Sequence, residues 1–257
     1  MDNGCVFLGV GKKRGGFFRV FFAVLSLSII HYQLSIAPAN AIPLELDLAD
    51  PMFLERTGDF VSRTSIDSGS YWNFRQVVSY GFSDRFTASA DIRYRAFGND
   101  NVHYNENGLS GLGIRGMYRA GQGATGATDI IFGYGFGGHG VVPQLSDDVY
   151  SVGVRTGRQW SGMTLAATIM TNWIFSDDPN LGMAYIDLTP EMYLRLKGDW
   201  SVGVGGTYRK ATLSALDQTW MNMMFGKTIG STGWFFNVGY ELEHADLRLG
   251  MTMNMLF

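Results

Sequence analysis

Residues 85–95 have the sequence RFTASADIRYR, in which apolar and polar side chains alternate at every position. Successive side chains of a β-strand point to opposite faces of a sheet, so the alternation predicts a strand with one apolar and one polar face. The apolar face holds Phe86, Ala88, Ala90, Ile92 and Tyr94. The polar face holds Thr87, Ser89, Asp91, Arg93 and Arg95. One face suits lipid, and the other suits water.

The same alternation recurs over 183–195 and 234–243. Pro190 falls among the apolar positions of the first segment, and because it has no backbone N–H to donate it predicts a β-bulge there. Alternation alone does not separate a membrane barrel from a soluble β-sandwich, since both bury one face of each strand.

Three further features favour the barrel. Many segments run for about ten residues or more, which is the length a tilted strand needs to cross a bilayer. Tight turns near 83–84, 160–162, 198–199 and 231–233 alternate with longer polar stretches at 98–108, 137–148 and 176–180. Short periplasmic turns and longer outer loops are typical of outer-membrane barrels. Aromatic side chains also cluster near the expected strand ends, where they suit membrane interfaces.

The fold class predicted is an all-β, transmembrane, antiparallel up-and-down barrel of twelve strands. The expected strands lie near 59–67, 70–82, 85–97, 109–120, 127–136, 149–160, 163–175, 183–197, 200–209, 218–229, 233–243 and 247–257. Twelve is even, so both termini fall on the periplasmic side and the longer loops fall outside. Ten or fourteen strands remain open as alternatives.

The N-terminus has the pattern of a secretory signal peptide. Lys12, Lys13, Arg14 and Arg19 precede the apolar stretch 20–30, and Ala39-Asn40-Ala41 offers a small-residue cleavage site. The expected domains are a signal peptide over 1–41, a periplasmic N-terminal lead-in over 42–58 and the barrel over 59–257. An uncleaved anchor is the alternative, although the apolar stretch is short for one. About 18 residues before the first strand are too few for an autotransporter passenger.

Cleavage removes Cys5, the only cysteine, so the mature chain forms no disulfide. Cleavage also takes four of the 20 basic residues and one of the 23 acidic residues, which leaves 16 against 22 and a net charge of −6. That balance argues against a nucleic-acid partner.

The C-terminal strand carries the most specific motif. Its apolar face is unbroken and consists of Leu247, Leu249, Met251, Met253, Met255 and Phe257, the terminal residue. It resembles the C-terminal assembly signal of Gram-negative outer-membrane β-barrel proteins of the porin-like kind, and the alternation extends that resemblance over 60–257. Methionine stands where the signal more often has an aromatic residue. The resemblance implies location in the bacterial outer membrane, contact with its lipid, and recognition by the barrel-assembly machinery through Met251, Met253, Met255 and Phe257.

On this register the inner face of the barrel is strongly charged. The predicted lumen-lining residues are Arg75, Asp91, Arg93, Arg95, Arg115, Arg155, Asp187, Glu191, Arg195, Arg209, Glu241 and Arg248, and the same face also receives Arg63, Asp67, Asp129 and Glu243. Guanidinium groups stay charged and bind carboxylates and phosphates through several donors, so they could form an anion-favouring wall. Alternatively, the arginines and acidic residues pair across a narrow lumen and only fill it.

The residues that could carry chemistry are sparse. The mature chain has three histidines, His103, His139 and His244, and the pair to name for catalysis at the outer rim is His244 with Asp246. His103 with Glu106 lacks a second histidine at metal-ligand spacing. Glycines over 133–138 lack the helix and Lys-Ser/Thr of a phosphate loop. No metal site, cofactor or catalytic residue is therefore predicted.

Three functions remain open. The first is a small porin-like channel for passive diffusion of small polar or anionic solutes. The second is a plugged structural or binding barrel that acts through loops 98–108 and 137–148. The third is a hydrolase at the outer rim, with His244 and Asp246 as the pair to test.

Overall fold

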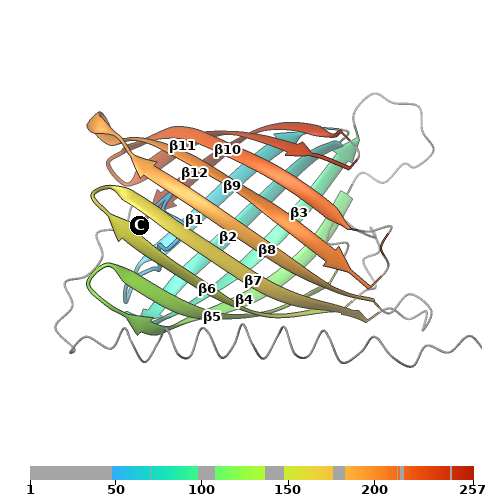
Figure 1. The fold of residues 1–257 in the computed structure, drawn as a ribbon, viewed down its shortest axis with the longest axis horizontal. Helices are drawn as coiled ribbons and strands as arrows, with labels where there is room; N and C mark the ends of the chain where they lie inside the picture. The colour runs from blue at the N-terminus through green and yellow to red at the C-terminus, as the bar shows by residue number, and fades with distance from the viewer. Residues whose placement is uncertain are drawn as a thin grey trace, which may run out of the picture. The chain divides into compact units, whose positions relative to one another are not determined.

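The computed structural model describes residues 48–69, 71–97, 108–136, 148–175, 183–212, 214, 217–243 and 245–257. They form one closed antiparallel barrel in which every strand pairs with its neighbours in sequence and β1 pairs with β12 (Figure 1). The strands are β1 (Phe60–Ser68), β2 (Tyr71–Ser83), β3 (Phe86–Phe97), β4 (Gly108–Gln122), β5 (Gly126–Phe136), β6 (Asp148–Trp160), β7 (Met163–Phe175), β8 (Met183–Arg195), β9 (Trp200–Ala211), β10 (Gln218–Ile229), β11 (Thr232–Glu241) and β12 (Leu247–Leu256).

The predicted fold class and all twelve predicted strands are confirmed, with bounds that differ by no more than two residues. The long period-two patterns carried enough information to place each strand, because a one-residue shift would turn every apolar side chain inward. The predicted signal peptide and its cleavage site lie outside the described residues. No helix in the described part of the chain is long and apolar enough to cross a membrane.

The barrel has two unlike ends. At the end we call the turn end, strands are joined by connections of two to four residues at 84–85, 123–125, 161–162, 196–199 and 230–231, and β1 begins beside the C-terminal residue. The other end, which we call the loop end, carries the connections at 69–70, 98–107, 137–147, 176–182, 212–217 and 242–246. This is the predicted division between short turns and longer loops.

The outward face is apolar along the length of the barrel. In β12, Leu249 and Met251 are 46% and 55% exposed, while the inward Asn254 is 5% exposed. Phe257 packs its ring edge-on against Phe60 at 5.8 Å, and its backbone N–H donates to the Phe60 carbonyl. The apolar tail therefore faces outward and also closes the seam between the first and last strands.

The predicted bulge at Pro190 is wrong. Pro190 pairs in register with Ala167 of β7. On the β9 side, pairing resumes at Glu191 in the same register as at Leu188, so Pro190 interrupts the ladder without inserting a residue. The irregularities lie instead between Gly81 and Ser83, Arg93 and Tyr94, and Arg119 and Gly121.

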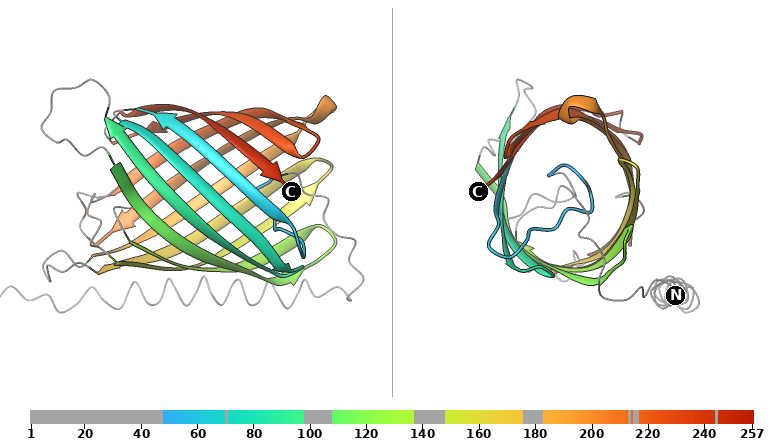
Figure 2. Two further views of the ribbon diagram at one scale, coloured as in Figure 1. Left: turned by 180° about the vertical axis from the view of Figure 1, so that it is seen from behind. Right: turned by 90° about the vertical axis from the view of Figure 1, so that its left-hand side faces the viewer.

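Residues 48–59, which we call the inner segment, enter the barrel before β1 begins. In the end-on view of Figure 2 this segment, in blue, lies inside the ring of strands. The sequence predicted no strand here, and the segment consists of turns and irregular backbone. The sequence predicted a periplasmic lead-in over 42–58, and the structure instead places the described part of this stretch inside the barrel.

Candidate functional site: the arginine-lined lumen

Two adjoining cavities occupy the lumen. The larger, of about 710 Å³, lies along β8 to β12 and reaches Ala49 and Pro51 of the inner segment. The smaller, of about 340 Å³, lies toward β2 to β4. The two share the lining residues Asp67, Arg75, Arg209 and Arg248.

Four arginines from β2, β3 and β4 gather at the smaller cavity, and we call them the cavity arginines: Arg75, Arg93, Arg95 and Arg115. Alternation places them all on the inner face, and Arg75 stands directly opposite Arg93 in the β2–β3 ladder. Opposite-strand neighbours on one face lie about 5 Å apart at Cβ, so like charges are held close together here.

Asp91 is the carboxylate at the centre of this group. Its Oδ2 accepts a 2.7 Å hydrogen bond from Arg93 Nε and lies 3.4 Å from Arg75 Nε, which has no hydrogen-bond partner in the described structure. A Cβ on Gly113 would lie 2.5 Å from Asp91 Oδ1, so this glycine leaves room for the carboxylate. Among the described residues, Arg115 makes no hydrogen bond or ion pair.

The described lining of the smaller cavity holds six arginines and two aspartates, Asp67 and Asp187. With Asp91 and Asp246, which pair with three of these arginines, four carboxylates stand against six arginines. This part of the lumen therefore carries an excess of positive charge, and the pairing that would neutralise it is incomplete.

Two further arginines are held against aromatic rings. Arg209 donates to both oxygens of Asp187, at 2.7 and 2.9 Å, and its guanidinium lies 4.0 Å from the Tyr185 ring centroid. Arg248 lies 4.2 Å from the Trp220 centroid. These cation–π contacts hold each guanidinium group against a ring, which reduces the freedom lost when an anion binds.

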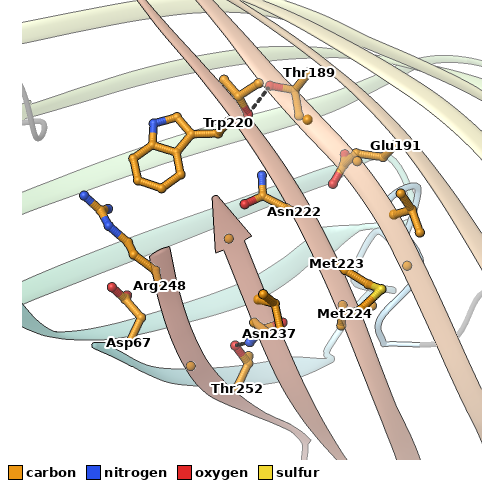
Figure 3. Close-up of a pocket in the computed structure, with 18 of the residues that line it drawn as sticks. Asp67, Thr189, Glu191, Trp220, Asn222, Met223, Met224, Asn237, Arg248 and Thr252 are labelled. Carbon is orange, nitrogen blue, oxygen red and sulfur yellow. Dashed lines mark hydrogen bonds between the residues drawn. The ribbon is translucent and has the colours of Figure 1, made fainter. Parts of the chain in front are cut away.

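The wall along β8 to β12 is mostly neutral (Figure 3). Asn222, Asn237, Thr252 and Thr189 project from different strands toward the larger cavity, and Asn237 donates to Thr252 Oγ1 at 2.8 Å. Glu191 supplies the carboxylate of this wall. Glycines at 203, 205, 239 and 250 widen the cavity, because no side chain projects from them.

A second group of arginines, the segment arginines, contacts the inner segment instead of lining a cavity. Arg119 Nη2 donates to the Met52 carbonyl at 2.7 Å, and Arg155 donates to the Pro51 and Phe53 carbonyls at 2.5 and 3.2 Å. Arg63 is the third member, and it pairs with the buried Glu55 at 3.0 Å.

Asp129 joins two of the segment arginines. Its side chain is completely buried and lies 2.8 Å from Arg119 Nε and 2.6 Å from Arg155 Nη2. Arg155 was predicted to line the lumen, and the structure places it in this network at the inner wall. Arg119 was missed, although it lies two and four residues from inward positions 117 and 115 and so shares their face.

Two predicted lining residues lie away from both cavities. Arg195 is half exposed at the turn end and faces Asp199 at 3.6 Å, because a turn with positive φ at Gly198 and Asp199 brings the two together. Glu241 is buried at the loop end of β11. The remaining predicted residues line one or both cavities, apart from Asp91, which lies among the cavity arginines, and Arg155.

The residues considered for catalysis, metal binding or phosphate binding form no second site among the described residues. His103, His139 and His244 fall outside the described residues, and so does the pairing of His244 with Asp246. No group of three or more His, Cys, Asp or Glu suited to a metal ion occurs in the described part of the chain. The described glycines of the 133–138 stretch belong to strand β5.

No protein-family model and no curated protein matches the chain. Solved structures do match. The KdgM porin in complex with disordered oligogalacturonate has a TM-score of 0.60 at 12% identity, over 76% of this chain and 98% of that one. An outer-membrane channel from Pseudomonas putida F1 has a TM-score of 0.59 at 11% identity, over 83% and 100%.

The translocator domain of the autotransporter NalP from Neisseria meningitidis also matches, with a TM-score of 0.52 at 10% identity, over 93% of this chain and 97% of that domain. Channels and a translocator thus share the architecture, so the function has to be argued from the lumen itself. The chain has the fold of Gram-negative outer-membrane β-barrel proteins, as the resemblance of its last strand implies.

Proposed function

We propose that the chain is a small porin-like channel of the outer membrane that passes small anionic solutes. The observation that carries this proposal is the cluster of cavity arginines, whose charge Asp91 only partly neutralises.

The distribution of charge supports an anionic solute. The mature chain has a net charge of −6, yet its described inner wall gathers six arginines at one cavity. Positive charge along a narrow, low-dielectric passage raises the local concentration of anions and repels cations. Guanidinium groups keep their charge over the whole physiological pH range, so the preference should not depend on pH there.

The chemistry of the guanidinium group indicates carboxylate or phosphate as the recognised group. Its planar fork of donors matches two oxygens at once, and Arg115, which makes no hydrogen bond or ion pair among the described residues, lines the smaller cavity with such donors. The KdgM porin, which shares the fold, was solved with oligogalacturonate, a polyanion.

Location and assembly form part of the same proposal. Cleavage near Ala41 would start the mature chain at Ile42, and the outward tail of Met251, Met253, Met255 and Phe257 would be recognised by the barrel-assembly machinery. The exposed apolar belt around the barrel would then contact outer-membrane lipid.

The test is planar-bilayer recording of the refolded mature chain under a KCl gradient. The proposal expects current steps whose reversal potential has the sign of an anion-selective pore. Cation selectivity would contradict it. So would silence in both the mature chain and a folded variant that lacks the inner segment.

The plugged binding barrel remains the second candidate, and the inner segment is the observation that favours it. In that case the lumen would conduct nothing, and loops 98–108 and 137–148 would carry the activity. Deletion of those two loops should then abolish a solute-dependent or cell-surface phenotype while the barrel still folds.

A further inference from the structure

The inward side chains at the turn end are buried almost all the way round the barrel. On ten of the twelve strands, one inward residue near this end is at most 5% exposed: Val61, Ser79, Thr87, Arg119, Asp129, Thr164, Tyr193, Ser201, Phe235 and Asn254. By contrast, the side chains of Arg75 in β2 and of Arg248, the second residue of β12, are 41% and 40% exposed. Among the described residues, open space therefore borders these two arginines but not the turn end.

The inner segment fills this end through contacts with opposite walls. Arg119 and Arg155, from β4 and β6, donate to its carbonyls. On the far side, Asn254 of β12 donates to the Leu48 carbonyl at 3.4 Å. These contacts stretch the segment across the lumen.

Two buried carboxylates of the segment extend the attachment. Asp50 accepts a 2.5 Å hydrogen bond from Thr164 Oγ1 of β7. Glu55 accepts from Ser79 Oγ at 2.6 Å and from Arg63 at 3.0 Å. A buried carboxylate is stable only when it is paired in this way, so these contacts require the segment to be seated.

The wall is also shaped to receive the segment. Met52 is 1% exposed and packs with Ala127 and Ala166. A Cβ on Gly157 would lie 2.6 Å from the Met52 sulfur, and a Cβ on Gly81 would lie 1.9 Å from the Arg56 carbonyl oxygen. Small residues thus stand where the segment touches the wall.

The segment joins β1 through a tight turn. Gly58 has a φ of +89°, which glycine adopts without strain, and its N–H donates to the Gly81 carbonyl at 2.8 Å. Thr57 donates to Asp84 Oδ1 from its backbone N–H and its hydroxyl, at 3.2 and 2.7 Å. These hydrogen bonds hold the pKa of the Asp84 carboxyl below its ordinary value.

We propose that the inner segment is an internal plug. It closes the lumen at the turn end and must move away from the inner wall before solute can pass. The cavity arginines then lie on the loop-end side of the plug, and Ala49 and Pro51 of the plug border the larger cavity. Asp129 is the residue that orients both arginines holding the plug in place.

The plug can be tested by locking it. The mature chain has no cysteine, so Met52→Cys with Ala166→Cys places one pair of thiols within the cluster that seats the segment, and loss of free thiol on oxidation verifies the disulfide. In bilayers, oxidation of the pair should lower the frequency of openings at least tenfold, and a reductant should restore the unlocked behaviour. A folded variant lacking residues 48–56 should conduct steadily and with larger steps than wild type.

A locked pair that conducts like its reduced form would overturn the plug, and so would a folded deletion variant whose conductance equals that of wild type. The recording depends on the proposed channel function, so the test includes a second measurement that does not depend on it. Single Met52→Cys should react with a membrane-impermeant maleimide at least tenfold more slowly than single Arg56→Cys, because Arg56 is exposed and Met52 is buried. Equal rates would show that the segment is not seated.

If Met52→Cys is protected but neither wild type nor the deletion variant conducts, the plug stands and the channel function fails. If the deletion variant and wild type conduct alike, the channel function stands and the plug fails.

Discussion

The cavity arginines and the segment arginines are the same residue type on the same face of neighbouring strands, yet they have opposite surroundings. Arg119 and Arg155 share the buried Asp129 and donate to backbone carbonyls. Arg75 and Arg115 face an open cavity and are incompletely paired. The partners of each guanidinium therefore differ between the groups: one group is tied to the inner segment, and the other is the group that we propose attracts an anionic solute.

The largest effect should come from removing the carboxylate of the segment group. Asp129→Ala leaves two buried arginines without their ion pair and should lower the free energy of unfolding by about 3–5 kcal/mol. Urea unfolding in phospholipid vesicles measures it. Asp187→Ala is the matched control, because its pair with Arg209 is more exposed, and a loss below about 2 kcal/mol is expected there. Equal losses would show that the complete burial of Asp129 does not set the size of the effect.

The same substitution made in each group should have different effects on stability. Arg119→Gln removes donors to Asp129 and Met52 and should cost about 2–4 kcal/mol. Arg115→Gln removes a charge that has no ion-pair partner among the described residues, so the unfolding free energy should change by less than about 0.5 kcal/mol. A large loss with Arg115→Gln would mean that the cavity group is structural as well.

A change in ionic strength should affect the cavity arginines and the segment arginines differently. The Debye length shortens from about 10 Å at 0.1 M salt to about 3 Å at 1 M, which screens charges that face water. The permeability ratio of anion to cation should therefore fall toward one at high salt. The stability difference between wild type and Asp129→Ala should stay within about 0.5 kcal/mol, because buried pairs are screened much less. A permeability ratio that does not change with salt would mean that groups other than the water-facing arginines set the selectivity.

The smallest effect concerns the attachment of the inner segment at Asp84. Because the folded-state pKa of this carboxyl is lowered, its contribution is present at higher pH and is lost as the pH falls through that lowered pKa. Hydrogen-exchange protection of the Thr57 amide should drop over the same acidic range. In Asp84→Asn the drop should disappear, since the amide oxygen accepts at any pH. If Thr57 protection still drops at acidic pH in Asp84→Asn, a group other than Asp84 causes the drop.

The sequence predicted the barrel almost completely, because twelve long alternating segments each report the same two faces. It also placed most cavity residues, such as Arg93 and Arg248, since inward orientation follows from strand register alone. The partners of the segment arginines on the inner segment could not be predicted, because Met52, Phe53 and Glu55 lie in an irregular stretch with no periodicity. The sequence therefore did not distinguish the arginines that bind the inner segment from those that line a cavity. Internal pairing describes the first group, and the selective wall stays a proposal for the second.

The central claim is that incompletely neutralised arginines make the lumen select anions. The most direct measurement is the reversal potential of the variant lacking residues 48–56, before and after Arg75→Gln with Arg115→Gln, in a KCl gradient of low ionic strength. The account predicts anion selectivity before substitution and a shift toward the non-selective value afterward. A reversal potential that the two substitutions leave unchanged would contradict it.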